Sequence, residues 1–214
     1  MVEPTARVRV PSQSRAIRTR QALLAAAERD FSERGYAATT AKTIALRADV
    51  ATGSFYQYFA SKDAVLRELA AQRLAGIAER SLALLESAPP GGTVSIEQAR
   101  TRMRAVVGLV MDAHRDDPGL HAVLTERRHA DRELDAITSA GERHMVERIA
   151  ALLERWGATG DTLAKAFVLF GMIEGSVHAH VLGQSVVSGP RFVAALVDAL
   201  LQVALPTTPL HRND

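Results

Sequence analysis

The chain has 214 residues, a formal net charge of +2, no cysteine and a mean hydropathy near zero, as is ordinary for a soluble globular protein. Without cysteine, disulfides and thiolate metal sites are excluded. The first twenty residues carry five arginines and no apolar run, and the longest apolar stretch, from Ala166, is too short to cross a bilayer, so we expect a soluble, cytoplasmic protein without a secretory signal.

Helical periodicity runs along the whole sequence, and no segment alternates as a strand would. We therefore expect an all-α protein of about nine helices. The first helix is predicted over 14–34, with Ile17, Leu24 and Phe31 on its buried face. Gly35 is expected to end this helix in a left-handed conformation.

The second and third helices are predicted to be short. Thr40 is a good N-cap for the second helix, and the stretch "VATGSFYQYFASKD" at 50–63 contains the third. Four of the ten aromatic residues of the chain fall in this stretch. Phe55 and Phe59 are four positions apart and share one helix face, which predicts that they are buried. The two tyrosines beside them do not share this face, so we expect them on a different surface of the helix.

The remaining helices follow at breaks rich in Gly and Pro. They are expected over about 61–86, 96–117, 120–124, 132–156, 161–184 and 190–205.

Charge is distributed unevenly along the chain. Residues 1–62 carry ten Lys or Arg against five Asp or Glu, a net charge of +5, whereas residues 63–214 carry sixteen against nineteen, a net charge of −3. A basic N-terminal quarter indicates a polyanionic partner. Three short helices with a tight turn between the last two indicate a helix-turn-helix, so we expect that partner to be double-stranded DNA.

The segment "TTAKTIALRADVATGSFYQYFASKDAVL", preceded by "FSERGY", closely resembles the DNA-binding signature of TetR-family transcriptional regulators. The resemblance implies a basic arm plus helix-turn-helix DNA-binding domain over 1–60. It also implies a helical ligand-binding and dimerisation domain over 61–206, followed by a loose tail at 207–214. Such a protein binds a palindromic operator as a homodimer, acts as a repressor and is released by a small-molecule inducer.

The same resemblance implies roles for residues around the helix-turn-helix. The residues expected at DNA are Thr40, Thr52, Gly53, Ser54, Tyr56, Gln57, Tyr58 and Lys62. Gly53 would let the backbone approach DNA closely, and Gln57 would read a base edge. Thr40, both tyrosines and Lys62 would contact phosphates.

Two positions depart from the family pattern. Asp49 stands where the family usually has glycine, and Asp tolerates the left-handed conformation better than most residues. Ala51 stands where a serine usually caps the recognition helix, a loss of about 1 kcal/mol unless Thr52 takes over as the cap. The exact start of the recognition helix is left open between these two residues.

Small residues recur every four positions along the penultimate helix, at Gly171, Gly175, Ala179 and Gly183. Such a stripe lets another helix pack with close backbone approach. With the family resemblance and the two-fold symmetry of operators, we prefer a dimer interface to an internal helix crossing.

The ligand pocket that the resemblance implies has several candidate residues. They are Met103, Val107, Met111, His114, Phe170, Glu174 and His178. An apolar helical stripe of this kind is also typical of an ordinary core, and Glu174 with His178 also suits a satisfied polar pair.

No metal site, cofactor or enzymatic activity is expected from the motifs. His178 and His180 lie on nearly opposite sides of a helix, and the Glu-x-x-His spacing at 126–129 has no second copy. Two alternatives to an inducible regulator are a constitutive DNA-binding protein and a helical-bundle metalloenzyme.

Overall fold

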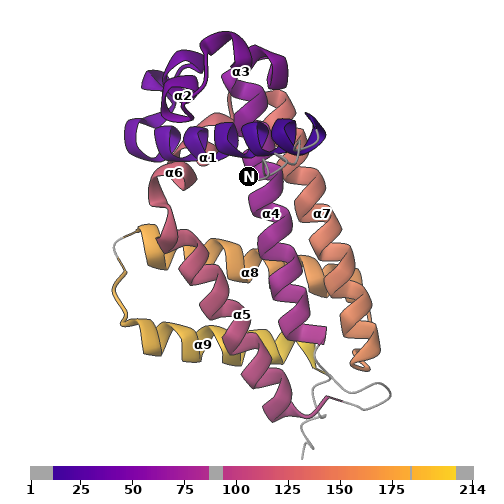
Figure 1. Cartoon of the computed structure of the whole chain (residues 1–214). Coiled ribbons are helices and arrows are strands. Elements are labelled where there is room, and N and C mark those ends of the chain that lie inside the picture. The colour runs from indigo at the N-terminus through magenta and orange to yellow at the C-terminus, as the bar shows by residue number, and fades with distance from the viewer. Residues whose placement is uncertain (1–11, 87–93, 184, 206–214) are drawn as a thin grey trace, which may run out of the picture.

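The computed structural model describes residues 12–86, 94–183 and 185–205, and within these ranges every regular element is a helix (Figure 1). The all-α prediction is therefore confirmed. None of the described helices is both long and apolar enough to span a membrane. The predicted C-terminal tail and most of the basic arm lie outside the described residues. The helices are α1 (Ser12–Ala38), α2 (Ala41–Arg47), α3 (Thr52–Tyr58), α4 (Lys62–Glu86), α5 (Ile96–Asp116), α6 (Pro118–Arg128), α7 (Arg132–Arg155), α8 (Thr162–Leu182) and α9 (Gly189–Ala204).

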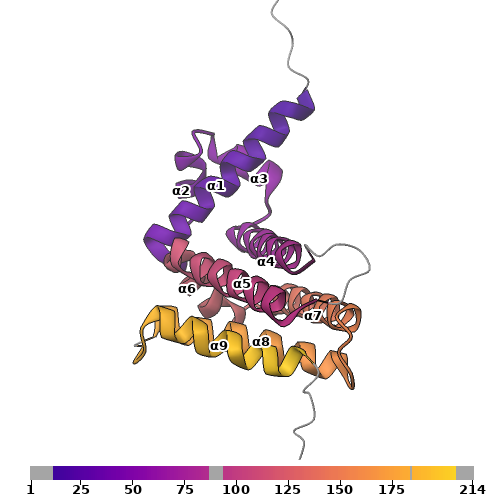
Figure 2. The ribbon, with the colours of Figure 1, turned by 90° about the horizontal axis from the view of Figure 1, so that it is seen from below.

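The first helix is longer than predicted and is interrupted near its end. Gly35 has φ 73° and ψ 178°, a conformation that glycine adopts without steric cost, so the expected break is present. Leu24 and Phe31 are buried as predicted. The prediction for Ile17 is wrong, because this side chain is 51% exposed. The N-terminal end of α1 projects beyond the other helices, and little of the fold covers it there (Figure 2).

The N-terminal core is built from more than the first three helices. Phe31, Ile44 and Phe55 pack together with Leu66 of α4 and Leu120 of α6. The first half of α4 and the short α6 therefore complete the hydrophobic core against which α2 and α3 pack. Their packing ties the helix-turn-helix to the rest of the chain.

A second core lies in the C-terminal half, where α5, α7, α8 and α9 meet the end of α4. Its centre is formed by fully buried residues such as Val107, Leu153, Val177 and Leu200. The helices α8 and α9 pack against each other and form the outer layer on the side away from α4 (Figure 2).

The short α6 is docked closely on α1. A Cβ atom added at Gly119 would lie 2.3 Å from the carbonyl oxygen of Ser32, so only glycine permits this approach. The hydroxyl of Ser32 donates to Asp117 Oδ1 at 2.6 Å, and the same oxygen accepts from the amide of Leu120 at 2.8 Å. Because of these contacts, a movement of α6 would also displace α1.

A charged link joins α4 to the start of α7. Arg67 Nε and Nη2 donate to the two carboxylate oxygens of Asp131, each at 2.9 Å. Asp131 also caps α7 by accepting from the amides of Glu133 and Leu134. The hydrogen bond from Arg67 is the main reason that the pKa of Asp131 lies below its usual value.

This link predicts a pH-dependent contribution to stability. Asn at position 131 keeps an acceptor for the helix cap but removes the charge, so Asp131→Asn will lower the free energy of unfolding at pH 7 by about 1–2 kcal/mol. Because the folded-state pKa of Asp131 is lowered, its contribution is present above pH 4 and is lost as pH falls through the folded pKa. Urea unfolding from pH 7 to pH 3 will therefore show the two proteins converging in acid.

Asp161→Asn is the matched control, since Asp161 caps α8 through the amide of Ala164. It will change stability little at any pH. A loss of stability in Asp131→Asn that is the same at every pH would contradict the charged link.

Candidate functional site

The start of α2 is closed by a reciprocal cap. Thr40 Oγ1 accepts from the amide of Thr43 at 3.1 Å, and Thr43 Oγ1 accepts from the amide of Thr40 at 3.0 Å. Thr40 itself is exposed. Its hydroxyl proton is therefore at the surface, where it can meet an external acceptor such as a phosphate.

Of the aromatic residues in and just after α3, the two phenylalanines are buried, while only one of the two tyrosines is fully exposed. Phe55 and Phe59 are buried in the N-terminal core, as predicted, and their ring centroids are 5.9 Å apart. Tyr56 is 60% exposed and meets the edge of Phe55, and Gln57 beside it is also exposed. Tyr58 is half-buried against the same core. The buried phenylalanines thus hold α3 so that Tyr56 and Gln57 point away from the protein.

The first residues of α3 are open to solvent. Thr52 and Gly53 are exposed, and Ser54 is half-buried. A Cβ added at Gly53 would meet no atom within 4 Å, and Gly53 has no positive φ. Nothing inside the described part of the chain therefore requires glycine at this position, which fits a close approach by a partner.

The structure shows how the two departures from the family pattern, Ala51 and Asp49, are accommodated at the start of α3 and in the turn before it. Ala51 occupies the N-cap position without a side-chain hydrogen bond, and the helix begins at Thr52. Thr52 does not take over the cap. Asp49 has φ 54°, so the turn is kept in the left-handed conformation that glycine would adopt more easily.

Lys62 is half-buried, and its ammonium group contacts other parts of the chain. Its Nζ donates to the carbonyl oxygens of Tyr36 at 2.7 Å and Thr39 at 2.9 Å, and it lies 3.9 Å from the centroid of the Tyr36 ring. Burial lowers the pKa of Lys62. The ammonium group therefore joins the start of α4 to the turn between α1 and α2, whereas its expected contact with phosphate stays a prediction.

The small-residue stripe of α8 lies on the surface of the chain. Gly171, Gly175 and Ala179 are exposed, and a Cβ added at either glycine would meet no atom within 4 Å. Gly183 differs, because it lies just past the end of α8 as its C-cap. The stripe is flanked by exposed apolar side chains, of which Phe167 is 69% exposed. The stripe makes no internal helix crossing at these glycines.

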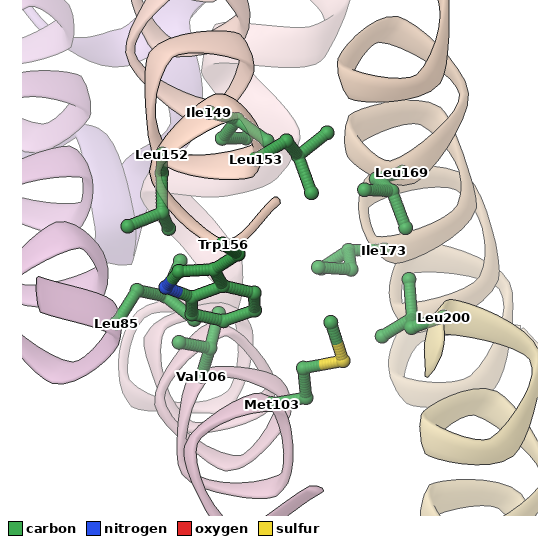
Figure 3. Close-up of a pocket in the computed structure, with 10 residues that line it drawn as sticks. All are labelled: Leu85, Met103, Val106, Ile149, Leu152, Leu153, Trp156, Leu169, Ile173 and Leu200. Atoms are coloured by element: carbon green, nitrogen blue, oxygen red, sulfur yellow. The ribbon is translucent and has the colours of Figure 1, made fainter. Parts of the chain in front are cut away.

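The apolar cavity of the C-terminal half is small, with a volume of about 40 Å³. Figure 3 shows its lining, which is wholly hydrophobic. The residues are Leu85, Met103, Val106, Ile149, Leu152, Leu153, Trp156, Leu169, Ile173 and Leu200. Of the pocket residues predicted from sequence, Met103 lines it, while Val107 and Met111 are buried in the surrounding core and Phe170 packs against that core. Ligand pockets typically enclose about 300–1,000 Å³, so a small molecule would have to displace side chains here.

The polar members of the predicted pocket gather elsewhere, where α5, α6 and α8 meet. His114 and His178 come together with His121, which the sequence analysis did not single out. His121 Nε2 lies 3.2 Å from His178 Nδ1, so one of the two rings donates to the other. Glu174 lies one turn before His178 on α8. The sequence feature that could have identified His121 is its position just past the Asp117-Pro118 break, where α6 begins next to the end of α5.

His114, His121 and His178 form a histidine cluster, and within it the surroundings of His121 disfavour a charged ring. Burial, followed by the neighbouring His114 and His178, lowers the pKa of His121 to about 4. Burial also raises the pKa of Glu174, and the two histidines near it oppose this effect. Both pKa shifts mean that burial disfavours the charged forms of His121 and Glu174.

Comparison with protein families finds two matches. Residues 23–69 match the model described as "Bacterial regulatory proteins, tetR family", and residues 100–203 match "Tetracyclin repressor-like, C-terminal domain". The first match contains α2, α3 and the start of α4, and the second contains most of the C-terminal helices. A search of the curated proteins found no match.

Solved structures share the fold over nearly the whole chain. A TetR-family transcriptional regulator from Mesorhizobium loti is 19% identical, with a TM-score of 0.73, covering 88% of this chain and 98% of that one. The fatty acid degradation regulator FadR from Bacillus halodurans is 19% identical, with a TM-score of 0.64 and coverages of 95% and 99%. A TetR-family regulator from Pectobacterium atrosepticum is 25% identical, with a TM-score of 0.62 and coverages of 90% and 95%.

Proposed function

The chain belongs to the TetR family of bacterial transcriptional regulators, and we propose that it is a homodimeric repressor of the cytoplasm that binds a palindromic operator and is released by a small-molecule inducer. We assign it no enzymatic step. Residues 1–60 form the DNA-binding domain in this proposal, and residues 61–206 carry the effector and dimer functions.

The geometry of α3 carries the proposal. Phe55 and Phe59 fix the helix from below, so that the exposed face presents Thr52, Tyr56 and Gln57 together. A helix with its polar face free fits the major groove, where Gln57 would make paired hydrogen bonds to adenine. Tyr56 would donate to a phosphate beside the groove, as would Thr40 at the start of α2. Ser54 and Tyr58 are only partly exposed and would contribute at the margin.

The exposed stripe on α8 supports the homodimer. A face of small residues flanked by Phe167 offers close helix packing to the same face of a second copy, as a two-fold interface requires. Two copies would then present two recognition helices to half-sites about 34–36 Å apart, or a multiple of that distance.

Two routes connect the C-terminal half with the DNA-binding domain. The helix α4 runs from the N-terminal core into the C-terminal core, and α6 is docked on α1 through Asp117 and Gly119. An inducer acts only through its preference for a conformer in which these helices have moved and the two recognition helices no longer match the operator.

The operator claim is tested with promoter DNA flanking the gene and two substitutions in α3. Tyr56→Phe removes only the hydroxyl and will weaken binding to all operator variants about fivefold, the loss of one hydrogen bond. Gln57→Ala will instead reduce the preference for one base pair in each half-site, at a cost of about 1–3 kcal/mol for that base pair. Binding is measured by fluorescence anisotropy against operators with each base pair changed in turn.

Gln21→Ala on the exposed surface of α1 is the control and will leave binding unchanged. Uniform weakening by Gln57→Ala across all sequences would refute a base-reading role. Full affinity in the double variant of Tyr56 and Gln57 would refute α3 as the recognition helix.

A further inference from the structure

The histidine cluster joins three helices through side chains that metals prefer. His114 comes from α5, His121 from α6 and His178 from α8, and one ring nitrogen of each lies within 4.8 Å of the other two. Tetrahedral zinc with Zn–N bonds of 2.0–2.1 Å places its ligand nitrogens about 3.3 Å apart. The pair His121 Nε2 and His178 Nδ1, at 3.2 Å, already has this separation.

The third ring, that of His114, also has an orientation that suits binding to a metal ion. His114 is buried, and its Nδ1 lies 2.8 Å from the carbonyl oxygen of Val110. A carbonyl oxygen only accepts, so Nδ1 is a protonated nitrogen, and in the neutral ring Nε2 then has the lone pair. Metal-binding histidines are typically held in this way, with the outer ring nitrogen donating to a backbone carbonyl.

We propose that His114, His121 and His178 form a three-imidazole site for a divalent transition metal of the zinc class. Imidazole donors suit zinc, cobalt, nickel and copper, and they do not suit magnesium or calcium. Three protein ligands leave one coordination position for water or for an anionic group. The proposal departs from the sequence-based expectation of no metal site, which considered His178 only with His180.

Charged groups of both signs lie near the cluster, Glu174 of α8 and Arg73 of α4. Glu174 lies one turn from His178, and burial disfavours its negative charge. A divalent cation beside it would stabilise that charge. Because the chain has no cysteine, no thiolate competes for the ion.

The position of the site gives the metal a route to the DNA-binding domain. The metal would clamp α6 to α5 and α8 through His121, and α6 is docked on α1 through Asp117 and Gly119. Metal binding is therefore expected to change operator affinity, a consequence that rests on the proposed function.

The site is tested by titrating the full-length, untagged, chelator-treated protein with Zn²⁺ in a calorimeter and with Co²⁺ in a visible spectrophotometer. The expected result is one ion per chain and a Co²⁺ spectrum typical of tetrahedral nitrogen coordination. His121→Asn and His178→Asn will each weaken binding by about 100-fold or more, because second-shell changes alone typically cost 10–100-fold. Both residues lie outside the hydrophobic cores, and circular dichroism melts will verify that the variants fold.

His144→Asn, at an exposed position of α7, is the matched control and will bind as the wild type does. Equal affinity in wild type and the double variant of His121 and His178, including no binding in either, would overturn the proposal.

A separate measurement examines the coupling. Operator affinity is compared with Zn²⁺ and with chelator, and a change of about fivefold or more is expected in the wild type but not in His121→Asn. Zinc bound at the cluster with no change at the operator would refute the coupling and leave the site. Zinc bound at the cluster of a wild-type protein that binds no operator would refute the proposed function and leave the metal site.

Discussion

Gly175→Arg will convert the protein to a monomer and weaken operator binding about 100-fold or more. A monomer can engage one half-site only, so the gain from binding two linked half-sites is lost. The substitution places a long cationic side chain in the middle of the exposed α8 stripe. In a two-fold interface each copy would bring its arginine to the same region, so two charges would be buried without partners.

The fold of the single chain will tolerate this change. A Cβ at Gly175 would meet no atom within 4 Å, and arginine is a better helix former than glycine. Loss of DNA binding in this variant therefore cannot be attributed to unfolding. Sedimentation equilibrium gives the oligomeric state, and a circular dichroism melt gives the stability.

The control is Gly76→Arg on α4, where a Cβ also meets no atom within 4 Å but which lies away from α8 and α9. This variant will stay dimeric. A dimeric Gly175→Arg protein with normal operator affinity would exclude the α8 stripe as the dimer interface.

Lys62→Met will lower the free energy of unfolding by about 2 kcal/mol or more. Methionine keeps the length of the side chain but removes two charge-assisted hydrogen bonds, to the carbonyls of Tyr36 and Thr39, together with the cation over the Tyr36 ring. The turn between α1 and α2 would lose these links to α4, while the hydrogen bond from the Tyr36 hydroxyl to Asp63 would remain.

The same variant separates a structural role from a phosphate contact. If Lys62 also binds a phosphate, as predicted, its removal will lower the slope of log affinity against log salt by about 1. We therefore expect reduced thermal stability together with a slope lower by about 1, and an unchanged slope would leave Lys62 with the structural role alone. Lys42→Met, at an exposed position of α2, is the stability control. An unaltered melting temperature in Lys62→Met would refute the anchoring role.

Local features of the sequence predicted much of the fold. Helical spacing located the helices, and residues such as Gly35 and Thr40 mark where they end or begin, because caps and breaks depend on a few neighbouring residues. The burial of Phe55 and Phe59 followed from a shared helix face in the same way. Ile17 was misjudged because periodicity shows which residues share a face but does not show where the covering helices stop.

The sequence by itself determined the helical class, the resemblance to a family of DNA-binding regulators, and the burial of Phe55 beside the exposed Tyr56 and Gln57 on α3. All three depend on short-range periodicity or on a contiguous motif. Only the tertiary structure decided the partners of side chains distant along the chain. It engaged Lys62 with Tyr36 and Thr39, and it brought His121 of α6 beside His178 of α8. Such contacts arise from how helices pack, and no spacing within a single helix encodes them.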